Sequence, residues 1–141
     1  MSKELWSYWV PANIEQSDYN IDSLCENGLN FIIILINYEK KDHEMHITFK
    51  KARCFRRTNE LYTVARMRMA YQQQTREFFL KRQSYKIINS EYLQWASQQS
   101  DGISDSAQLE HYVVFTDDIV LDILCANEPA ITFVDRNQSH A

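Results

Sequence analysis

The chain has 141 residues, 45% of them apolar and 24% charged, a composition typical of a folded domain rather than a disordered segment. A chain of this length buries roughly 70% of the surface that its unfolded form exposes, so its core needs no disulfide or metal ion. Only two glycines and two prolines occur, which excludes glycine-rich phosphate loops, collagen repeats and flexible linkers. We therefore expect one domain over residues 1–141.

The cysteines and the apolar runs bear on the compartment. Cys25, Cys54 and Cys125 are far apart and odd in number, which fits neither a disulfide framework nor a zinc knuckle, so we expect buried, reduced thiols. The longest apolar run, Phe31–Ile36, is far shorter than the ~20 residues of a membrane-spanning helix. No signal-peptide pattern occupies the first residues. These features predict a cytoplasmic protein that does not enter a membrane.

Two strand patterns stand in the first third of the chain. Near the start, alternation places Trp6 and Tyr8 on one face of an extended segment and Trp9 on the other. The segment Leu29–Tyr38 is rich in β-branched and aromatic residues, and the polar run Glu39–Glu44 follows it. This order predicts a central strand and then a hairpin loop.

The middle of the chain also favours strands. Apolar and polar residues alternate over Met45–Phe55, which predicts a partly buried partner strand. After a turn at residues 58–60, the segment Leu61–Gln73 fits both helical and strand spacing, and we favour a strand. For Glu77–Asn89 we expect one long bent strand or two short ones.

A helix and a strand follow. Ser90 precedes an acidic residue and an apolar stripe at helical spacing, so we expect a helix that begins there and ends near Gly102. The segment His111–Phe115 has the apolar, β-branched composition of a strand.

The last elements complete the predicted fold. Asp117 and Asp118 would favour the positive end of a second helix, whose buried face would consist of Ile119, Val120, Ile123 and Leu124. A final strand is expected over Ala130–Val134. Together the elements predict an α+β fold: an antiparallel β-sheet with two short helices packed on one face.

Charge is strongly segregated along the chain. Residues 1–49 carry a net charge of -5, residues 50–86 carry +9, and residues 87–141 carry -8. The basic segment also contains aromatic residues, and a basic, aromatic sheet face would bind RNA by stacking and phosphate contacts. The aromatic residues in question are Phe55, Tyr62, Tyr71, Phe78, Phe79 and Tyr85. Because the whole chain is acidic, we favour instead an arrangement in which these bases pair with acids of neighbouring strands and helices.

The histidines give no clear catalytic or metal site. His43 and His46 are three residues apart in a predicted strand, so they would point to opposite faces rather than share a metal ion. His111 follows Glu110 and would act as a general base in a small hydrolase, but the sequence identifies no nucleophile for it. We therefore predict no catalytic residue, no cofactor and no metal.

Four acidic residues near the end of the chain form the predicted binding site. Asp118 and Asp122 would share one face of the second predicted helix, one turn apart. With Asp117 and Glu128 they would form an exposed acidic patch beside the last strand, suited to docking a basic protein.

Several short segments together carry a family resemblance: Phe55–Glu60, Ser90–Trp95 and His111–Thr116, together with Asp118, Asp122–Leu124 and Glu128–Pro129. They resemble small bacterial immunity proteins, which accompany polymorphic or contact-dependent growth-inhibition toxins. The resemblance covers about a third of the chain and contains no catalytic signature. It implies a cytosolic inhibitor that binds one cognate toxin domain, often a nuclease, and blocks its active site.

The leading functional hypothesis is therefore a non-enzymatic inhibitor of the immunity type, which would occlude the basic substrate cleft of a nuclease-like toxin through Asp117, Asp118, Asp122 and Glu128. The alternative from another class is a nucleic-acid-binding module that uses residues 50–86. No membrane partner is expected.

Overall fold

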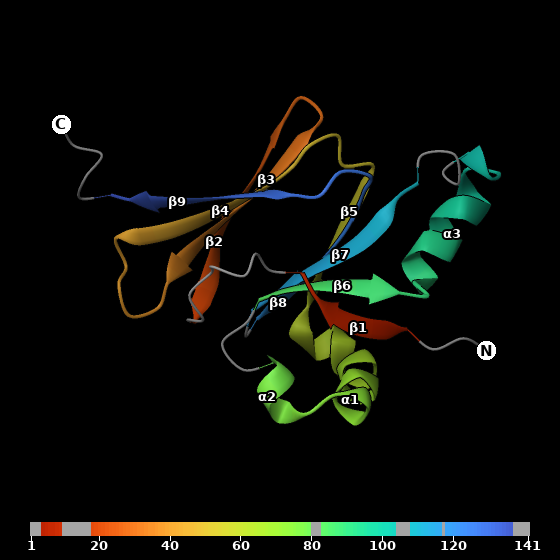
Figure 1. Ribbon diagram of the computed structural model, residues 1–141, viewed down its shortest axis with the longest axis horizontal. Coiled ribbons are helices and arrows are strands. Elements are labelled where there is room, and N and C mark those ends of the chain that lie inside the picture. Colours follow the sequence, from red (N-terminus) through yellow and green to blue (C-terminus); the bar gives the residue numbers. More distant parts are fainter. Residues whose placement is uncertain (1–3, 10–17, 80–82, 104–107, 117, 137–141) are drawn as a thin grey trace.

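A computed structural model describes residues 4–9, 18–79, 83–103, 108–116 and 118–136 (Figure 1). The described elements form two antiparallel sheets. Sheet A has the strand order β1-β6-β7-β8-β5, and sheet B has the order β2-β3-β4-β9. The strands are β1 Leu5–Tyr8, β2 Tyr19–Asn27, β3 Asn30–Asn37, β4 His43–Phe49, β5 Cys54–Asn59, β6 Ser84–Ile88, β7 Glu110–Phe115, β8 Ile119–Cys125 and β9 Ala130–Asp135. The helices are η1 Glu60–Thr63, α1 Val64–Gln73, α2 Arg76–Phe79 and α3 Glu91–Gln99.

The two sheets pack face to face around the main core. In β3, buried and half-buried residues alternate strictly, and Ile33 and Leu35 are fully buried on the face toward sheet A. Leu121 and Ile123 of β8 meet them from the other side. The strand β3 lies between β2 and β4, so the prediction of a central strand is confirmed.

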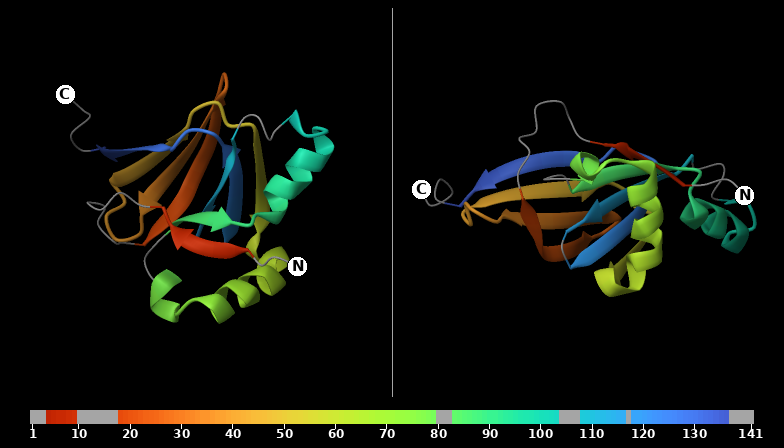
Figure 2. Two further views of the ribbon diagram at one scale, coloured as in Figure 1. Left: turned by 45° about the vertical axis from the view of Figure 1, so that its right-hand side comes forward. Right: turned by 90° about the horizontal axis from the view of Figure 1, so that it is seen from below.

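The other face of sheet A is covered by the helices. In β8 this face carries Val120, Asp122 and Leu124. Residues of α1 and α2 pack in the same cluster as Val120, and α3 packs on Leu124. Figure 2 shows the orange and gold strands of sheet B and the helices on opposite sides of the molecule, with sheet A between them. Sheet A is therefore buried on both faces along β8.

The predicted α+β fold with one sheet and two helices is wrong. The protein is mostly β, with nine strands in two sheets among the described residues. The error arose where the pattern over Met45–Phe55 was interpreted as one strand. The chain turns at Lys50 and Lys51, and β4 and β5 belong to different sheets.

The segment Leu61–Gln73, predicted as a strand, is helical instead. The next predicted segment, Glu77–Asn89, begins inside the helix α2 and contains one strand, β6. Alanine, methionine, arginine and glutamine dominate α1, and these residues have high helix propensity. Asn59 fixes the start, because its side chain accepts a hydrogen bond from the backbone N–H of Leu61 at 3.0 Å. The spacing of the apolar residues fitted both a helix and a strand, and the high helix propensity of the residues favours the helix.

The opposite error occurred at residues 119–125, predicted as a helix. They form β8, with Ile119 and Val120 at its start. A strand buried on both faces is apolar at nearly every position. Such a run also places apolar residues at the spacing of a buried helix face, so periodicity does not distinguish the two.

Other predictions are confirmed. Ser90 caps α3 by accepting a hydrogen bond from the Leu93 N–H at 2.9 Å, and Tyr92 and Ala96 are buried. The strands at His111–Phe115 and Ala130–Val134 are present as β7 and β9.

The N-terminal aromatic residues also lie as predicted. Trp6 and Tyr8 both contact Tyr85, whereas Trp9 packs against Tyr112 on the other face.

All three cysteines are free, but they are not all buried. Cys125 is buried, Cys54 is half-buried and Cys25 is exposed, so the prediction holds only for the first. In the described part of the chain, no helix has the length and apolarity needed to cross a membrane.

The core predicts a large difference between two isoleucines. Ile33 in β3 is 0% exposed, and Ile88 in β6 is 52% exposed. We expect Ile33→Ala to lower the free energy of unfolding by about 2 to 5 kcal/mol, because it leaves a cavity between the sheets. The control Ile88→Ala should change it by less than about 1 kcal/mol. Urea denaturation of both variants measures this, and equal losses would contradict the sandwich.

Candidate functional site

Asp122 lies at the centre of a buried polar network. The strand alternation of β8 turns it away from sheet B, toward α1 and α3, and its side chain is 0% exposed. An isolated carboxylate in such a place would cost several kcal/mol, so it requires bonded partners.

Two arginines and a histidine provide those partners. Arg66 of α1 donates two parallel hydrogen bonds to the Asp122 carboxylate, at 2.7 and 2.9 Å. Arg56 of β5 donates from Nε at 3.0 Å, and His111 of β7 places Nε2 at 2.6 Å. A paired, bidentate geometry is the strongest that a carboxylate and a guanidinium form.

The network continues to the start of α3 and to the N-terminal segment. His111 Nδ1 lies 2.6 Å from the hydroxyl of Ser90, which caps α3. Glu4 lies with one oxygen 3.6 Å from Arg66 Nε and accepts a hydrogen bond from the Glu91 N–H at 3.0 Å. The Arg56 side chain is 46% exposed, whereas Ser90, His111 and Asp122 are buried. We name the group after these central residues and call it the buried network: Glu4, Arg56, Arg66, Ser90, His111 and Asp122.

The electrostatics favour an ionised Asp122. Burial alone would raise the pKa of its carboxyl, but the hydrogen bonds from His111 and Arg66 and the charge of Arg66 outweigh burial and lower it well below its ordinary value of 3.8. The same carboxylate, by its hydrogen bond and charge, raises the pKa of Arg66, although burial alone would lower it.

The row Ser90, His111 and Asp122 has the residue types of a hydrolase triad. In such triads Nε2 faces the serine and Nδ1 faces the aspartate, whereas here the two nitrogens are exchanged. Ser90 is 4% exposed and His111 is 0% exposed, so the hydroxyl faces no solvent-filled site. Its oxygen also accepts the Leu93 N–H. The geometry suits a structural link between β7, β8 and α3.

The predicted acidic patch is wrong as a joint surface. Asp122 is buried and fully bonded, and Asp118 is exposed just before β8. Glu128 is exposed just after β8 and accepts a hydrogen bond from Trp9 at 3.0 Å. Because β8 is a strand rather than a helix, its two ends lie about 20 Å apart. Asp117 lies outside the described residues.

The predicted separation of His43 and His46 is confirmed, because their spacing of three residues in β4 places them on opposite faces. His46 pairs with Glu44 at 2.6 Å on its own face. His43 instead lies near two carboxylates, at 3.9 Å from Asp42 and 3.5 Å from Asp135. Their ligand atoms lie within 4.8 Å of one another, so these three could hold a metal ion. The distances also fit an ordinary surface ion pair.

The predicted basic sheet face for RNA does not form, because residues 60–73 and 76–79 are helical. Of the aromatic residues assigned to it, Phe79 and Tyr85 are buried in the core. Three of its bases are paired within the protein: Arg56 and Arg66 with Asp122, and Lys86 with Glu110. The expectation that bases pair with neighbouring acids is therefore confirmed for these three.

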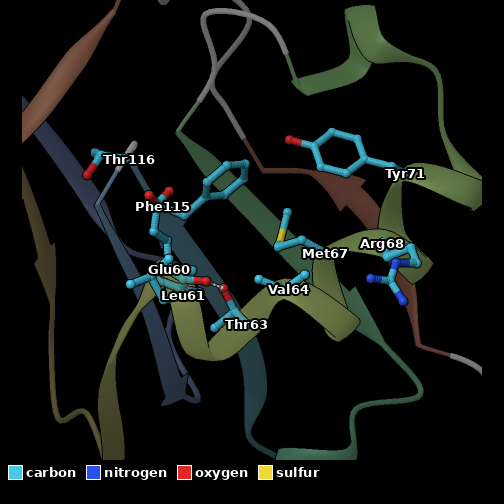
Figure 3. Close-up of a pocket in the computed structure, with 10 residues that line it drawn as sticks. Glu60, Leu61, Thr63, Val64, Met67, Arg68, Tyr71, Phe115 and Thr116 are labelled. Atoms are coloured by element: carbon cyan, nitrogen blue, oxygen red, sulfur yellow. Dashed lines mark hydrogen bonds between the residues drawn. The ribbon is translucent and has the colours of Figure 1, made fainter.

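The helical segment η1–α1 exposes apolar side chains. Leu61 is 73% exposed, Tyr62 85%, Val64 52% and Tyr71 50%, and within α1 only Ala70 is buried. Beside this segment is an open cavity of about 580 Å³, lined by residues of η1 and α1 and by the ends of β7 and β8. Figure 3 shows Met67 and Phe115 in the middle of the lining, with Arg68 on one side and Glu60 on the other. We call this surface, which includes the half-buried Met67 and the charged Arg68, the α1 face. Its residues are Leu61, Tyr62, Val64, Met67, Arg68 and Tyr71.

Comparison of the chain with protein-family models, curated proteins and solved structures finds no match. The function is therefore argued from the site geometry alone.

The buried network predicts a strong effect of Asp122→Asn. The change removes the carboxylate that Arg56, Arg66 and His111 contact, and it leaves the Arg66 and His111 donors away from solvent without an anion. We expect a loss of about 3 to 5 kcal/mol in the free energy of unfolding. The matched control Asp118→Asn, at an exposed position, should change it by less than about 0.5 kcal/mol. Chemical denaturation at neutral pH tests both, and a mild effect at Asp122 would contradict the network.

The lowered pKa of Asp122 also predicts a pH dependence. In the unfolded chain the carboxyl takes up its proton as the pH falls past about 3.8, whereas in the folded protein it stays ionised to lower pH. Its stabilising contribution is therefore complete above that pH and declines as the pH falls below it. The difference in unfolding free energy between the wild type and Asp122→Asn should shrink below pH about 4. A difference that stays constant down to pH 3 would refute the assignment.

Proposed function

We propose that this chain is a non-enzymatic protein-binding protein and that the α1 face is its docking surface. The observation that carries the proposal is the exposure of Leu61, Tyr62, Val64 and Tyr71 along one helical segment beside an open cavity. Large apolar side chains that are exposed close together in the chain of a folded protein are typical of interaction sites.

The composition of the α1 face supports protein recognition. Tyrosine, methionine and arginine are enriched at the centres of interfaces, and the face contains Tyr62, Tyr71, Met67 and Arg68. Few side chains of the segment η1–α1 are fully buried in the core: only Thr63 of η1 and Ala70 of α1. Leu61, Tyr62 and Val64 are therefore exposed for contact with a partner, whereas Met67 packs partly against the core and one side of the Tyr71 ring contacts Phe79.

The charges suggest the chemistry of that partner. Arg68 lines the cavity and is exposed, and the described residues form no ion pair with it within 4.0 Å. A partner segment with an apolar side chain for the cavity and a neighbouring carboxylate for Arg68 would satisfy both features. We take the occupant to be a protein segment of this kind.

The resemblance to immunity proteins supports an inhibitory form of this function, because such proteins act by binding. In that form the α1 face, rather than the predicted acidic patch, would contact the toxin domain. The rival function, nucleic-acid binding, lacks the predicted basic sheet face but keeps exposed bases at Lys50, Lys51, Arg53 and Arg57.

Two substitutions test the docking surface. We expect Val64→Asp and Tyr71→Asp to weaken partner binding by about tenfold or more, since each places a charge in the apolar contact. The control Trp95→Asp changes a residue that is also 50% exposed but lies on α3. It should bind like the wild type.

The partner is first captured from the native host, both with and without nuclease treatment of the samples, and it is then purified. Its dissociation constant is measured for the wild type and the three variants, and far-UV circular dichroism confirms that each is folded. Binding that is unchanged in Val64→Asp and Tyr71→Asp would reject the α1 face. Capture that nuclease treatment abolishes would favour nucleic-acid binding instead.

A further inference from the structure

One end of sheet B brings together three side chains of the kinds that bind metal ions. His43 is the first residue of β4 and lies directly opposite Asp135, the last residue of β9. Asp42 precedes His43 in the chain. Figure 1 shows this end of the sheet, where β9 ends beside the start of β4. The three residues therefore lie together although β4 and β9 are far apart in the sequence.

Hydrogen bonds fix the backbone at this end of the sheet. The His43 N–H donates to the Lys40 carbonyl at 2.9 Å and closes the turn before β4. The Arg136 N–H donates to the Asp42 carbonyl at 2.8 Å, which joins that turn to the end of β9. Because the backbone is already ordered, the three side chains can act together without the entropy cost of ordering a loop.

The three side chains converge without forming one close pair. His43 Nε2 lies 3.5 Å from an oxygen of Asp135 and 3.9 Å from an oxygen of Asp42. Each residue offers one ligand atom, and the three atoms lie within 4.8 Å of one another. These distances are longer than a good hydrogen bond. On the same strand His46 does form such a bond, with its Nε2 at 2.6 Å from Glu44.

The spacing suits a small ion between the three ligand atoms. Zinc binds histidine nitrogen and carboxylate oxygen at about 2.0 to 2.2 Å, and a tetrahedron with such bonds separates neighbouring ligand atoms by about 3.3 to 3.6 Å. The distance from His43 to Asp135 already lies in this range. Only the Asp42 side chain has to move closer, and it is bound to a fixed backbone.

We propose that Asp42, His43 and Asp135 form a binding site for a divalent first-row transition metal, with zinc as the representative ion. The imidazole selects this class, because magnesium and calcium prefer ligand sets made of oxygen. Two carboxylates and one neutral imidazole also balance the charge of one divalent ion. The three side chains are 29 to 42% exposed, so water or a donor from another molecule can occupy the fourth position.

Isothermal titration calorimetry with zinc tests the site. The untagged chain is first stripped of metal with a chelator, in a Cys25→Ser background that removes the exposed thiol. We expect one ion per chain. His43→Gln should weaken binding about tenfold or more, because it replaces the nitrogen ligand by an amide that zinc binds poorly. The matched control His46→Gln changes the other histidine of β4 and should bind zinc like the background protein.

Thermal unfolding gives a second readout. Zinc should raise the Tm of the background protein and of His46→Gln, because an ion that binds only the folded state stabilises it. The increase should be smaller in His43→Gln and in Asp135→Asn, which keeps the size of the side chain but removes its charge. Far-UV circular dichroism without zinc confirms that every variant is folded.

Zinc that binds His43→Gln as tightly as His46→Gln would overturn the inference, because the ion would then lie elsewhere. The absence of saturable zinc binding would reduce the cluster to a surface ion pair and overturn it as well. Tighter binding of calcium than of zinc would overturn the class of metal. The site lies at sheet B and α1 packs on sheet A, so Val64→Asp should bind zinc normally whatever its effect on docking.

Discussion

The carboxylate of Asp122 is the constraint on which the arrangement of the helices depends. It is fully buried, and its partners Arg66, Arg56 and His111 come from α1, β5 and β7. Through Ser90, the same network reaches the start of α3. Each element must therefore take one position relative to β8 for the charge to be compensated. Apolar contacts alone would tolerate small shifts of these elements, whereas a buried ion pair does not.

The sequence predicted well wherever a single local signal was decisive. The strand at residues 30–37 and the helix capped by Ser90 were predicted correctly, because the residue pattern of each segment fitted only one type of secondary structure. The prediction was wrong at residues 61–73 and 119–125, where two periods fitted equally. Burial on both faces of sheet A produced the second ambiguity, and it became visible only once the helices were placed against β8.

The predicted site was wrong for the same reason. A helix at residues 119–125 would have exposed Asp122, whereas the strand buries it between Val120 and Leu124, on the face that the helices cover. A signal was present: a single acid inside the run Ile119–Cys125, in a chain with a strongly basic middle segment, indicates a buried charge that needs an arginine. Which arginine provides the partner depends on long-range packing. The α1 face could not be predicted either, because its segment was assigned to a strand.

The connections between the strands have a consequence for folding kinetics. The hairpins β2–β3, β3–β4 and β7–β8 join neighbours in the chain, but β1 pairs with β6, β5 with β8 and β4 with β9. Each of these last pairings requires a long loop to close, which costs conformational entropy before the stabilising contacts form. We expect the β2–β3–β4 meander to form early and sheet A to complete late, which places refolding in the slow range of milliseconds to seconds that stopped-flow mixing resolves.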